Sequence, residues 1–226
     1  MLRISMVLIA LFAVVSFSVF PTSAETPATG WKSGINYDVI EPRQPTRAAP
    51  PRIEVVEAFW YSCPHCNALE PDINRWLQKK PEYIQFVRIP VTWNPQRRAD
   101  ARLYYVLTAL HRQDLHQDVF DTIHVRKQSL YGKSDAETYE LQLEFAQEHG
   151  IAKKDFLAAY NSEFVEKSLE DADRLTRAYR IAGVPSMVVN GRYSTDLDKA
   201  GSTKNLFAIV DSLARSEHES LASAAR

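Results

Sequence analysis

The stretch IEVVEAFWYSCPHC, residues 53–66, decides the fold because it joins a buried strand to a helix that starts at a pair of cysteines. Residues 53–59 are mostly apolar, which is typical of a central strand covered on both faces. Pro64 suits the first turn of a helix, where its missing N–H costs nothing. Cys63 and Cys66 are the only cysteines among 226 residues, so one C-x-x-C at a helix start carries all the thiol chemistry.

The position of Cys63 favours redox chemistry. A helix start places unpaired backbone N–H groups and the positive end of the helix dipole beside the first sulfur. His65 adds a cation when protonated and a hydrogen-bond donor when neutral, so a thiolate at Cys63 is stabilised and its pKa is lowered. Because a disulfide has no thiolate to stabilise, such a site favours the dithiol and makes the disulfide a stronger oxidant. Cys66, one turn further along, is expected to be more buried, to keep a higher pKa and to resolve mixed disulfides.

Two other uses of the cysteine pair stay open. A lone C-x-x-C could be a structural disulfide, although so short a loop removes little chain entropy. A zinc site needs more ligands than the pair and His65 supply, and no second cysteine pair follows. Three histidines of the helical region are expected on exposed faces of amphipathic helices: His111, His116 and His124. We therefore predict no metal site.

The rest of the pattern predicts a sheet interrupted by helices. Residues 83–89 read as a second strand, so strand, helix and strand make a βαβ unit with parallel strands. Helical periodicity then holds from about Pro95 for about eighty residues. The pattern ends with a strand over 186–189, a two-residue turn at Asn190-Gly191, a partner strand from Arg192-Tyr193 and a helix marked by Leu206, Ile209, Val210 and Leu213.

The N-terminus predicts an export signal. Arg3 precedes an almost wholly apolar run over residues 6–20, and small residues lead to a cleavage site after Ala24. A membrane anchor is the other interpretation, but the run is shorter than the ~20 residues that a span needs. We expect a flexible leader over residues 25–34 and a frayed tail over residues 216–226.

Charge and composition exclude one class of partner. The formal net charge is −1 and no basic run of the nucleic-acid-binding type is present. Aromatic residues make up 11% of the chain, which favours a packed globule. Core packing is also the expected role of the aromatics near the motif, although they could form a peptide-binding surface: Trp60, Tyr61, Trp93 and Tyr104.

The stretch 53–66 resembles the active-site strand and helix of the DsbA-type thiol:disulfide oxidoreductases, which are thioredoxin-fold proteins of the bacterial periplasm. The Pro-His pair between the cysteines is typical of them, Gly183-Val184-Pro185 matches their cis-proline loop, and the helical region matches their insert. The resemblance implies an α/β thioredoxin fold, a central mixed sheet flanked by helices, with an inserted all-helical domain. The expected division is a signal peptide 1–24, a leader 25–34, thioredoxin parts 35–95 and 178–215, a helical insertion 96–177 and a tail 216–226.

The resemblance also implies roles for single residues. Cys63 becomes the exposed nucleophile and Cys66 the resolving thiol, while Pro64 and His65 belong to the catalytic motif and His65 stabilises the reduced state. Pro185, unless it is an ordinary trans proline, is cis and packs against the disulfide. The backbone of Val184 is then open to pair with a substrate strand.

Two charged residues complete the expected site. Glu57 matches the acidic residue beneath the active site of the family, the alternative being a solvated acid at a sheet edge. Arg88 stands where family members often have lysine. Because arginine keeps its proton at working pH, this difference leaves proton handling at Cys66 in question.

The predicted function is that of a periplasmic dithiol oxidase, which donates the Cys63–Cys66 disulfide to newly exported proteins through a mixed disulfide at Cys63. The implied partners are unfolded cysteine-containing proteins and a DsbB-like, quinone-linked membrane oxidase, with no dissociable cofactor, no nucleic acid and a monomeric state. The alternatives are a disulfide reductase or isomerase, and a peptide-binding chaperone module with a vestigial dithiol.

Overall fold

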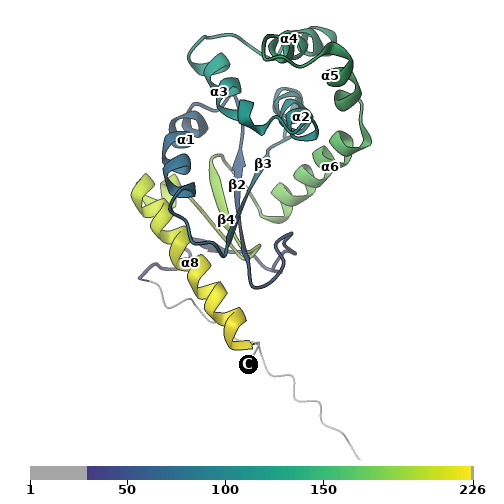
Figure 1. Cartoon of the computed structure of the whole chain (residues 1–226). Helices are drawn as coiled ribbons and strands as arrows, with labels where there is room; N and C mark the ends of the chain where they lie inside the picture. Colours follow the sequence, from purple (N-terminus) through teal and green to yellow (C-terminus); the bar gives the residue numbers. More distant parts are fainter. Residues whose placement is uncertain (1–29, 225–226) are drawn as a thin grey trace, which may run out of the picture.

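A five-stranded mixed sheet forms the centre of the molecule (Figure 1). The computed structural model describes residues 30–224, and the predicted export signal and residues 25–29 and 225–226 lie outside that range. The strand order is β1-β5-β4-β2-β3. The strands are β1 (Asp38–Val39), β2 (Ile53–Phe59), β3 (Ile84–Pro90), β4 (Ser186–Val189) and β5 (Tyr193–Asp196).

The strand β2 is the central element, as its apolar sequence predicts. All its residues are buried, it pairs in parallel with β3 and it pairs antiparallel with β4. The helix α1 (Pro64–Leu77) connects β2 to β3 and completes the predicted βαβ unit. In the register Glu57 of β2 lies beside Arg88 of β3 on one side and Met187 of β4 on the other. The C-x-x-C motif therefore lies at the carboxyl end of β2, which also carries the buried Glu57 beside the partly buried Arg88.

The helical region lies between β3 and β4 in the chain. Asn94, Ser134 and Ser162 cap three of its helices with side-chain acceptors. Figure 1 shows most of these helices gathered at one end of the sheet, away from the C-terminal helix. The elements are α2 (Pro95–Ala109), the 3₁₀ turn η1 (Gln113–Leu115), α3 (His116–His124), α4 (Asp135–Glu148), α5 (Lys153–Tyr160) and α6 (Glu163–Ala178).

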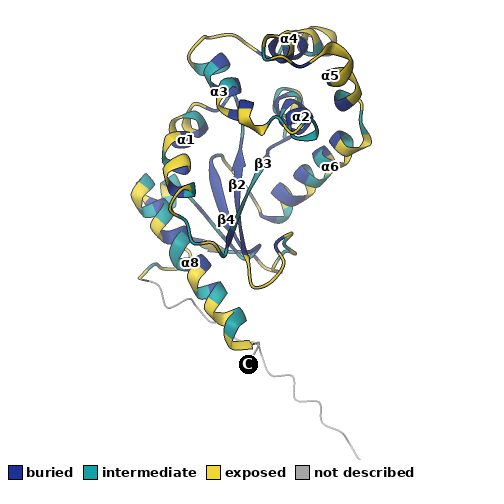
Figure 2. Ribbon diagram, in the orientation of Figure 1, coloured by how far each residue is buried: buried dark blue, intermediate teal, exposed yellow. Residues whose placement is uncertain are grey.

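Two hydrophobic clusters build the core on the two faces of the sheet (Figure 2). The first contains both cysteines and joins the sheet to the helical region. The second packs the sheet against α1 and the C-terminal helix α8 (Thr203–Ala224). The strand β2 contributes to both, because Ile53 and Val55 belong to the second cluster and Val56 and Phe59 to the first.

The C-terminal prediction was wrong, because α8 continues through residues 216–224 where we expected a frayed tail. Glu217 is buried and its carboxylate accepts hydrogen bonds from Asn190 at 2.8 Å and Arg192 at 3.2 Å. Arg43 adds an ion pair at 3.3 Å. These partners come from segments far away in the sequence, so local periodicity gave no sign of them.

Two smaller expectations also need correction. The hairpin between β4 and β5 has Arg192 inside its turn, so the partner strand begins at Tyr193 and not at Arg192. The short helix α7 (Leu197–Ala200) follows β5. Residues 30–34, expected to be flexible, form an ordered turn in which the Gly34 N–H donates to Tyr37, and Trp31 packs against the second cluster. Trp31 contacts the core, and the small and polar residues around it in the sequence gave no indication of this contact.

Within residues 30–224 no helix is both long and apolar enough to cross a membrane.

Candidate active site

Cys63 is the N-cap residue of α1. Its backbone is extended, with φ −84° and ψ 118°, and its sulfur accepts a hydrogen bond from the Cys66 N–H at 3.4 Å. The Cys63 N–H in turn donates to the Trp60 carbonyl at 3.0 Å, which closes the turn between β2 and α1. Both cysteines are free thiols in the structure. The sulfur of Cys63 thus occupies the position where a helix binds negative charge.

The two thiols have opposite acidities. The pKa of Cys63 is lowered from its ordinary value of 9.0 to about 6, first by the hydrogen bond from the Cys66 thiol and then by the N–H groups of Cys66 and His65 and the charge of His65, against a burial cost. The pKa of Cys66 is raised, first because its hydrogen stays bonded to the Cys63 sulfur and second because it is buried. Cys63 is 7% exposed and Cys66 is 0% exposed. Only Cys63 therefore offers a thiolate at neutral pH.

The loop before β4 lies opposite Cys63. The Val184–Pro185 peptide is cis, as the resemblance implied. The carbonyl oxygen of Val184 lies 3.5 Å from the Cys63 sulfur and accepts a hydrogen bond from its thiol. This contact brings Val184, and with it Pro185, to the sulfur, although Val184 lies 121 residues from Cys63 in the chain. Their role toward a substrate stays a prediction.

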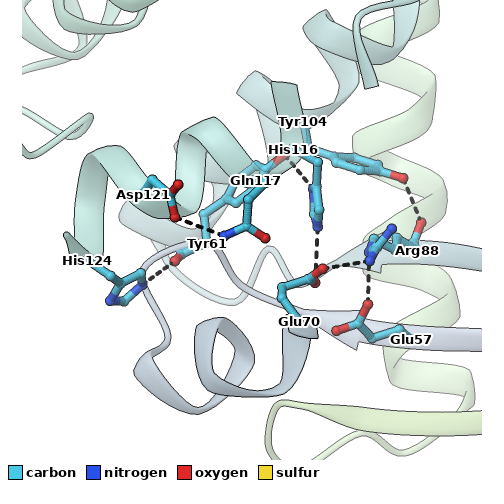
Figure 3. Close-up of polar contacts among 9 residues, drawn as sticks. All are labelled: Glu57, Tyr61, Glu70, Arg88, Tyr104, His116, Gln117, Asp121 and His124. Atoms are coloured by element: carbon cyan, nitrogen blue, oxygen red, sulfur yellow. Dashed lines mark hydrogen bonds and ion pairs between the residues drawn. The ribbon is translucent and has the colours of Figure 1, made fainter. Parts of the chain in front are cut away.

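A chain of polar side chains, most of them buried, links β2 and β3 to α1 and α3 (Figure 3). Arg88 donates to Glu57 at 3.0 Å and to Glu70 at 2.8 Å. The other oxygen of Glu70 lies 3.2 Å from His116 Nε2, and His116 Nδ1 lies 2.9 Å from the Tyr61 hydroxyl. The five residues come from β2, the loop after it, α1, β3 and α3, so the chain ties the sheet to the helical region.

Glu57 is the charged group of this chain that acts on the cysteines. It is 0% exposed, and its Oε1 has no hydrogen-bond partner among the described residues. Burial raises its pKa to about 8, with Arg88 opposing the rise and Glu70 and Cys63 adding to it. Its charge also contributes to the raised pKa of Cys66. Because this pKa lies above 7, the Glu57 carboxyl is mostly protonated at neutral pH.

Sequence reasoning missed two members of the chain. Glu70 follows Cys66 by one helical turn and so shares its face of α1, a spacing that could have identified it. His116 was expected on a surface and is instead buried, with its pKa lowered by burial. His111 is exposed as expected, and His124 is half-buried with Nε2 at 2.8 Å from the Tyr61 carbonyl. No sequence pattern pairs α3 with the loop before Cys63.

Two further predictions concern packing and metals. Tyr61 is buried in the first cluster, in keeping with core packing, while Trp60, Trp93 and Tyr104 are half-buried. In the part of the chain that the structure describes, no group of three or more His, Cys, Asp or Glu side chains is arranged to hold a metal ion.

The comparisons with known proteins agree on one family. A family model described as DSBA-like thioredoxin domain matches residues 54–208. The thiol:disulfide interchange protein DsbA of Azotobacter vinelandii is 40% identical over 215 residues, which cover 94% of this chain and 97% of the relative. DsbA of Pseudomonas aeruginosa is 34% identical over 214 residues, covering 94% and 96%.

Solved structures show the same likeness. The crystal structure of Pseudomonas aeruginosa DsbA superposes with a TM-score of 0.76 at 33% identity, covering 89% of this chain and 100% of the other. The oxidoreductase DsbA from Xylella fastidiosa gives a TM-score of 0.73 at 26% identity, with 81% and 96% covered. The predicted α/β thioredoxin fold is thereby confirmed.

Proposed function

The chain belongs to the DSBA-like thioredoxin domain family and is a thiol:disulfide oxidoreductase, and on that premise we propose that Cys63 is its nucleophile and Cys66 its resolving thiol. The observation that carries this assignment is the place of Cys63 at the start of α1, where its sulfur accepts the Cys66 N–H at 3.4 Å, whereas Cys66 is fully buried one turn further along. The opposite shifts of the two pKa values agree with it. The members of this family work through a redox-active disulfide, and their compartment is the bacterial periplasm.

Oxidation of a substrate proceeds in two exchanges. A substrate thiolate attacks the Cys63 sulfur, the Cys63–Cys66 bond breaks, and the electron pair leaves on Cys66. A second substrate thiolate then attacks the substrate sulfur of the mixed disulfide and expels Cys63 as a thiolate. The substrate loses two electrons and this protein gains them as a dithiol. The lowered pKa of Cys63 makes it a good leaving group in the second exchange.

The first exchange requires a proton at Cys66. The pKa of its thiol is raised, so the leaving sulfur takes up a proton at neutral pH. Glu57, with a pKa of about 8, holds a proton beneath that sulfur. Arg88 keeps its own proton, so its role is to hold the carboxyl groups of Glu57 and Glu70 in place. We assign proton supply to Glu57, while His65 favours the thiolate of Cys63 after release.

We propose that Val184 and Pro185 form the binding site for the substrate backbone. Their backbone lies against the nucleophilic sulfur, with the Val184 carbonyl at 3.5 Å. An extended substrate segment could pair with this backbone and place its cysteine at Cys63. Pairing through the main chain suits a protein that oxidises many sequences.

The partners follow from the family and from the predicted export signal. We propose that residues 1–24 direct the chain to the periplasm, that its substrates are newly exported cysteine-containing proteins, and that a DsbB-like membrane oxidase restores its disulfide. N-terminal sequencing of the mature protein tests the signal, with Glu25 expected as the first residue. We also propose the boundaries 35–95, 96–177 and 178–215 for the two thioredoxin parts and the insertion.

Oxidation of a reduced, unfolded substrate tests the function. We expect the wild type to form substrate disulfides and Cys63→Ser to form none. A potential as reducing as that of a thioredoxin would instead favour the reductase alternative. Full function in Cys63→Ser would favour the chaperone alternative and contradict the proposed nucleophile.

A further inference from the structure

Two helices of the helical region bind the short segment that leads into Cys63. We call this segment, residues 61–62, the entry loop. His124 at the end of α3 lies with Nε2 at 2.8 Å from the Tyr61 carbonyl oxygen (Figure 3). His116 at the start of α3 lies with Nδ1 at 2.9 Å from the Tyr61 hydroxyl. Asp100 of α2 accepts a hydrogen bond from the Ser62 hydroxyl at 2.7 Å.

The donors and acceptors of these contacts follow from chemistry. A carbonyl oxygen only accepts, so Nε2 of His124 carries the hydrogen and donates to Tyr61. His116 faces the Glu70 carboxylate with Nε2, so Nε2 carries the hydrogen and Nδ1 accepts from the Tyr61 hydroxyl. Burial lowers the pKa of His116, which agrees with this neutral form. Each contact therefore has one donor and one acceptor.

Burial makes these contacts specific. Asp100 is 2% exposed, and a carboxylate removed from water needs a partner, which the Ser62 hydroxyl supplies. Tyr61 is 1% exposed and its ring meets the edges of Phe59 and Phe120. The loss of a contact would leave a buried polar group unpaired, which costs more than an exposed hydrogen bond. The entry loop is thus held in one position from outside the strand and helix that it connects.

This position matters because Cys63 follows directly. As N-cap residue it needs an extended backbone and a sulfur turned toward the first helical N–H groups, and the Cys66 N–H reaches that sulfur at 3.4 Å. The direction in which the chain arrives at Cys63 is set by Tyr61 and Ser62. A loosened entry loop would let the sulfur move away from its donors.

We propose that His124, His116 and Asp100 are positioning residues, which hold the entry loop so that Cys63 stays at the helix N-terminus and which thereby set the oxidising strength of the protein. The inference rests on the proposed role of Cys63 as nucleophile. It makes the helical region part of the redox site, although none of its side chains touches either sulfur in the contacts above. Release of the loop weakens thiolate stabilisation, so the dithiol is less favoured and the disulfide is a weaker oxidant.

The test compares His124→Ala with a matched control, His149→Ala. His149 is also half-buried and also bonds a backbone carbonyl, that of Phe145 at 2.7 Å, but within α4 and away from the entry loop. The readouts are the redox equilibrium with glutathione and the thiolate titration of Cys63 by ultraviolet absorbance. We expect His124→Ala to shift the equilibrium at least about threefold toward the protein disulfide, within the range for loss of one hydrogen bond, and to raise the titration midpoint. His149→Ala should match the wild type.

The inference is overturned if both variants keep the wild-type equilibrium, even where His124→Ala unfolds more easily. A purely structural contact stabilises both redox forms equally and leaves the equilibrium unchanged. If His124→Ala does not fold, Tyr61→Phe decides instead, because it keeps the ring and removes only the hydroxyl that bonds His116. A wild-type midpoint at the ordinary thiol value would overturn the proposed role of Cys63 as well, whereas a low midpoint that no variant moves would overturn this inference alone.

Discussion

Replacement of Cys66 by alanine tests which donor stabilises the Cys63 thiolate. The largest contribution to the lowered pKa of Cys63 is the hydrogen bond from the Cys66 thiol, and the variant removes it. The N–H of residue 66 and the contributions of His65 stay in place. The variant therefore separates one side-chain donor from the helix N-terminus.

The magnitude follows from the structure. The pKa of Cys63 falls from 9.0 to about 6, and each unit corresponds to about 1.4 kcal/mol of preference for the thiolate. A hydrogen bond to a charged group contributes about 1.5–3 kcal/mol, or roughly one to two units. We therefore expect the Cys63 midpoint of Cys66→Ala at about pH 7–8, above the wild type and below an ordinary thiol.

The assay is the ultraviolet absorbance of the thiolate, recorded against pH in the reduced wild type and in Cys66→Ala. Cys66 does not interfere in the wild type, because its raised pKa places its titration above that of Cys63. The same variant in strong denaturant provides the reference for an unfolded thiol. An unchanged midpoint near 6 would refute the assignment to the Cys66 thiol, and a wild-type midpoint near 9 would refute a stabilised thiolate altogether.

Three further predictions concern the buried charges and pH. Arg88→Met leaves the buried Glu70 carboxylate and the buried Glu57 carboxyl group without their cation, so the free energy of unfolding should fall by about 3–5 kcal/mol in urea titrations. Arg177→Met, which breaks an exposed pair with Asp173, should change the free energy of unfolding far less, and equal losses would contradict the buried-charge argument. In a Cys63→Ala background at a pH above 8, where Glu57 is ionised, Glu57→Gln removes a negative charge that raises the pKa of Cys66, so alkylation of Cys66 should become severalfold faster, and an unchanged rate would exclude that influence. Because folding lowers the pKa of Cys63, the stability that its thiolate adds to the reduced form is full above the ordinary pKa of 9.0 and is lost as the pH falls through about 6. The extra stability at pH 7 should be about 1 kcal/mol after solvent screening, measured by urea unfolding of the reduced and oxidised forms, and a difference that does not depend on pH would count against it.

Local signals in the sequence were sufficient for the sheet and the redox motif. The strand over residues 53–59 has the predicted bounds, because seven successive residues form one buried, apolar segment. The N-cap position of Cys63 follows from Pro64 and the end of that strand. These features depend on neighbours in the chain, which a single sequence displays.

Features that depend on distant partners were beyond such reasoning. His116 looks like an ordinary polar residue of an amphipathic helix until Glu70 and Tyr61 are placed beside it. The last turns of α8 likewise depend on Asn190, which bonds Glu217 from the hairpin. In both cases a polar side chain is buried because a partner from another segment satisfies it, and periodicity alone assigns such a residue to the surface.

The division of the core into two clusters has a consequence for which buried residues can be substituted without contact to the active site. Both cysteines belong to the cluster beneath the helical region, whereas α8 packs only into the cluster on the opposite face. The buried residues of α8, such as Leu206 and Ile209, reach the cysteines only through the strands and through α1, whose Leu69 and Trp76 belong to the same cluster. Substitutions there should therefore change the stability of the fold and leave the direct hydrogen bonds of the Cys63 sulfur in place.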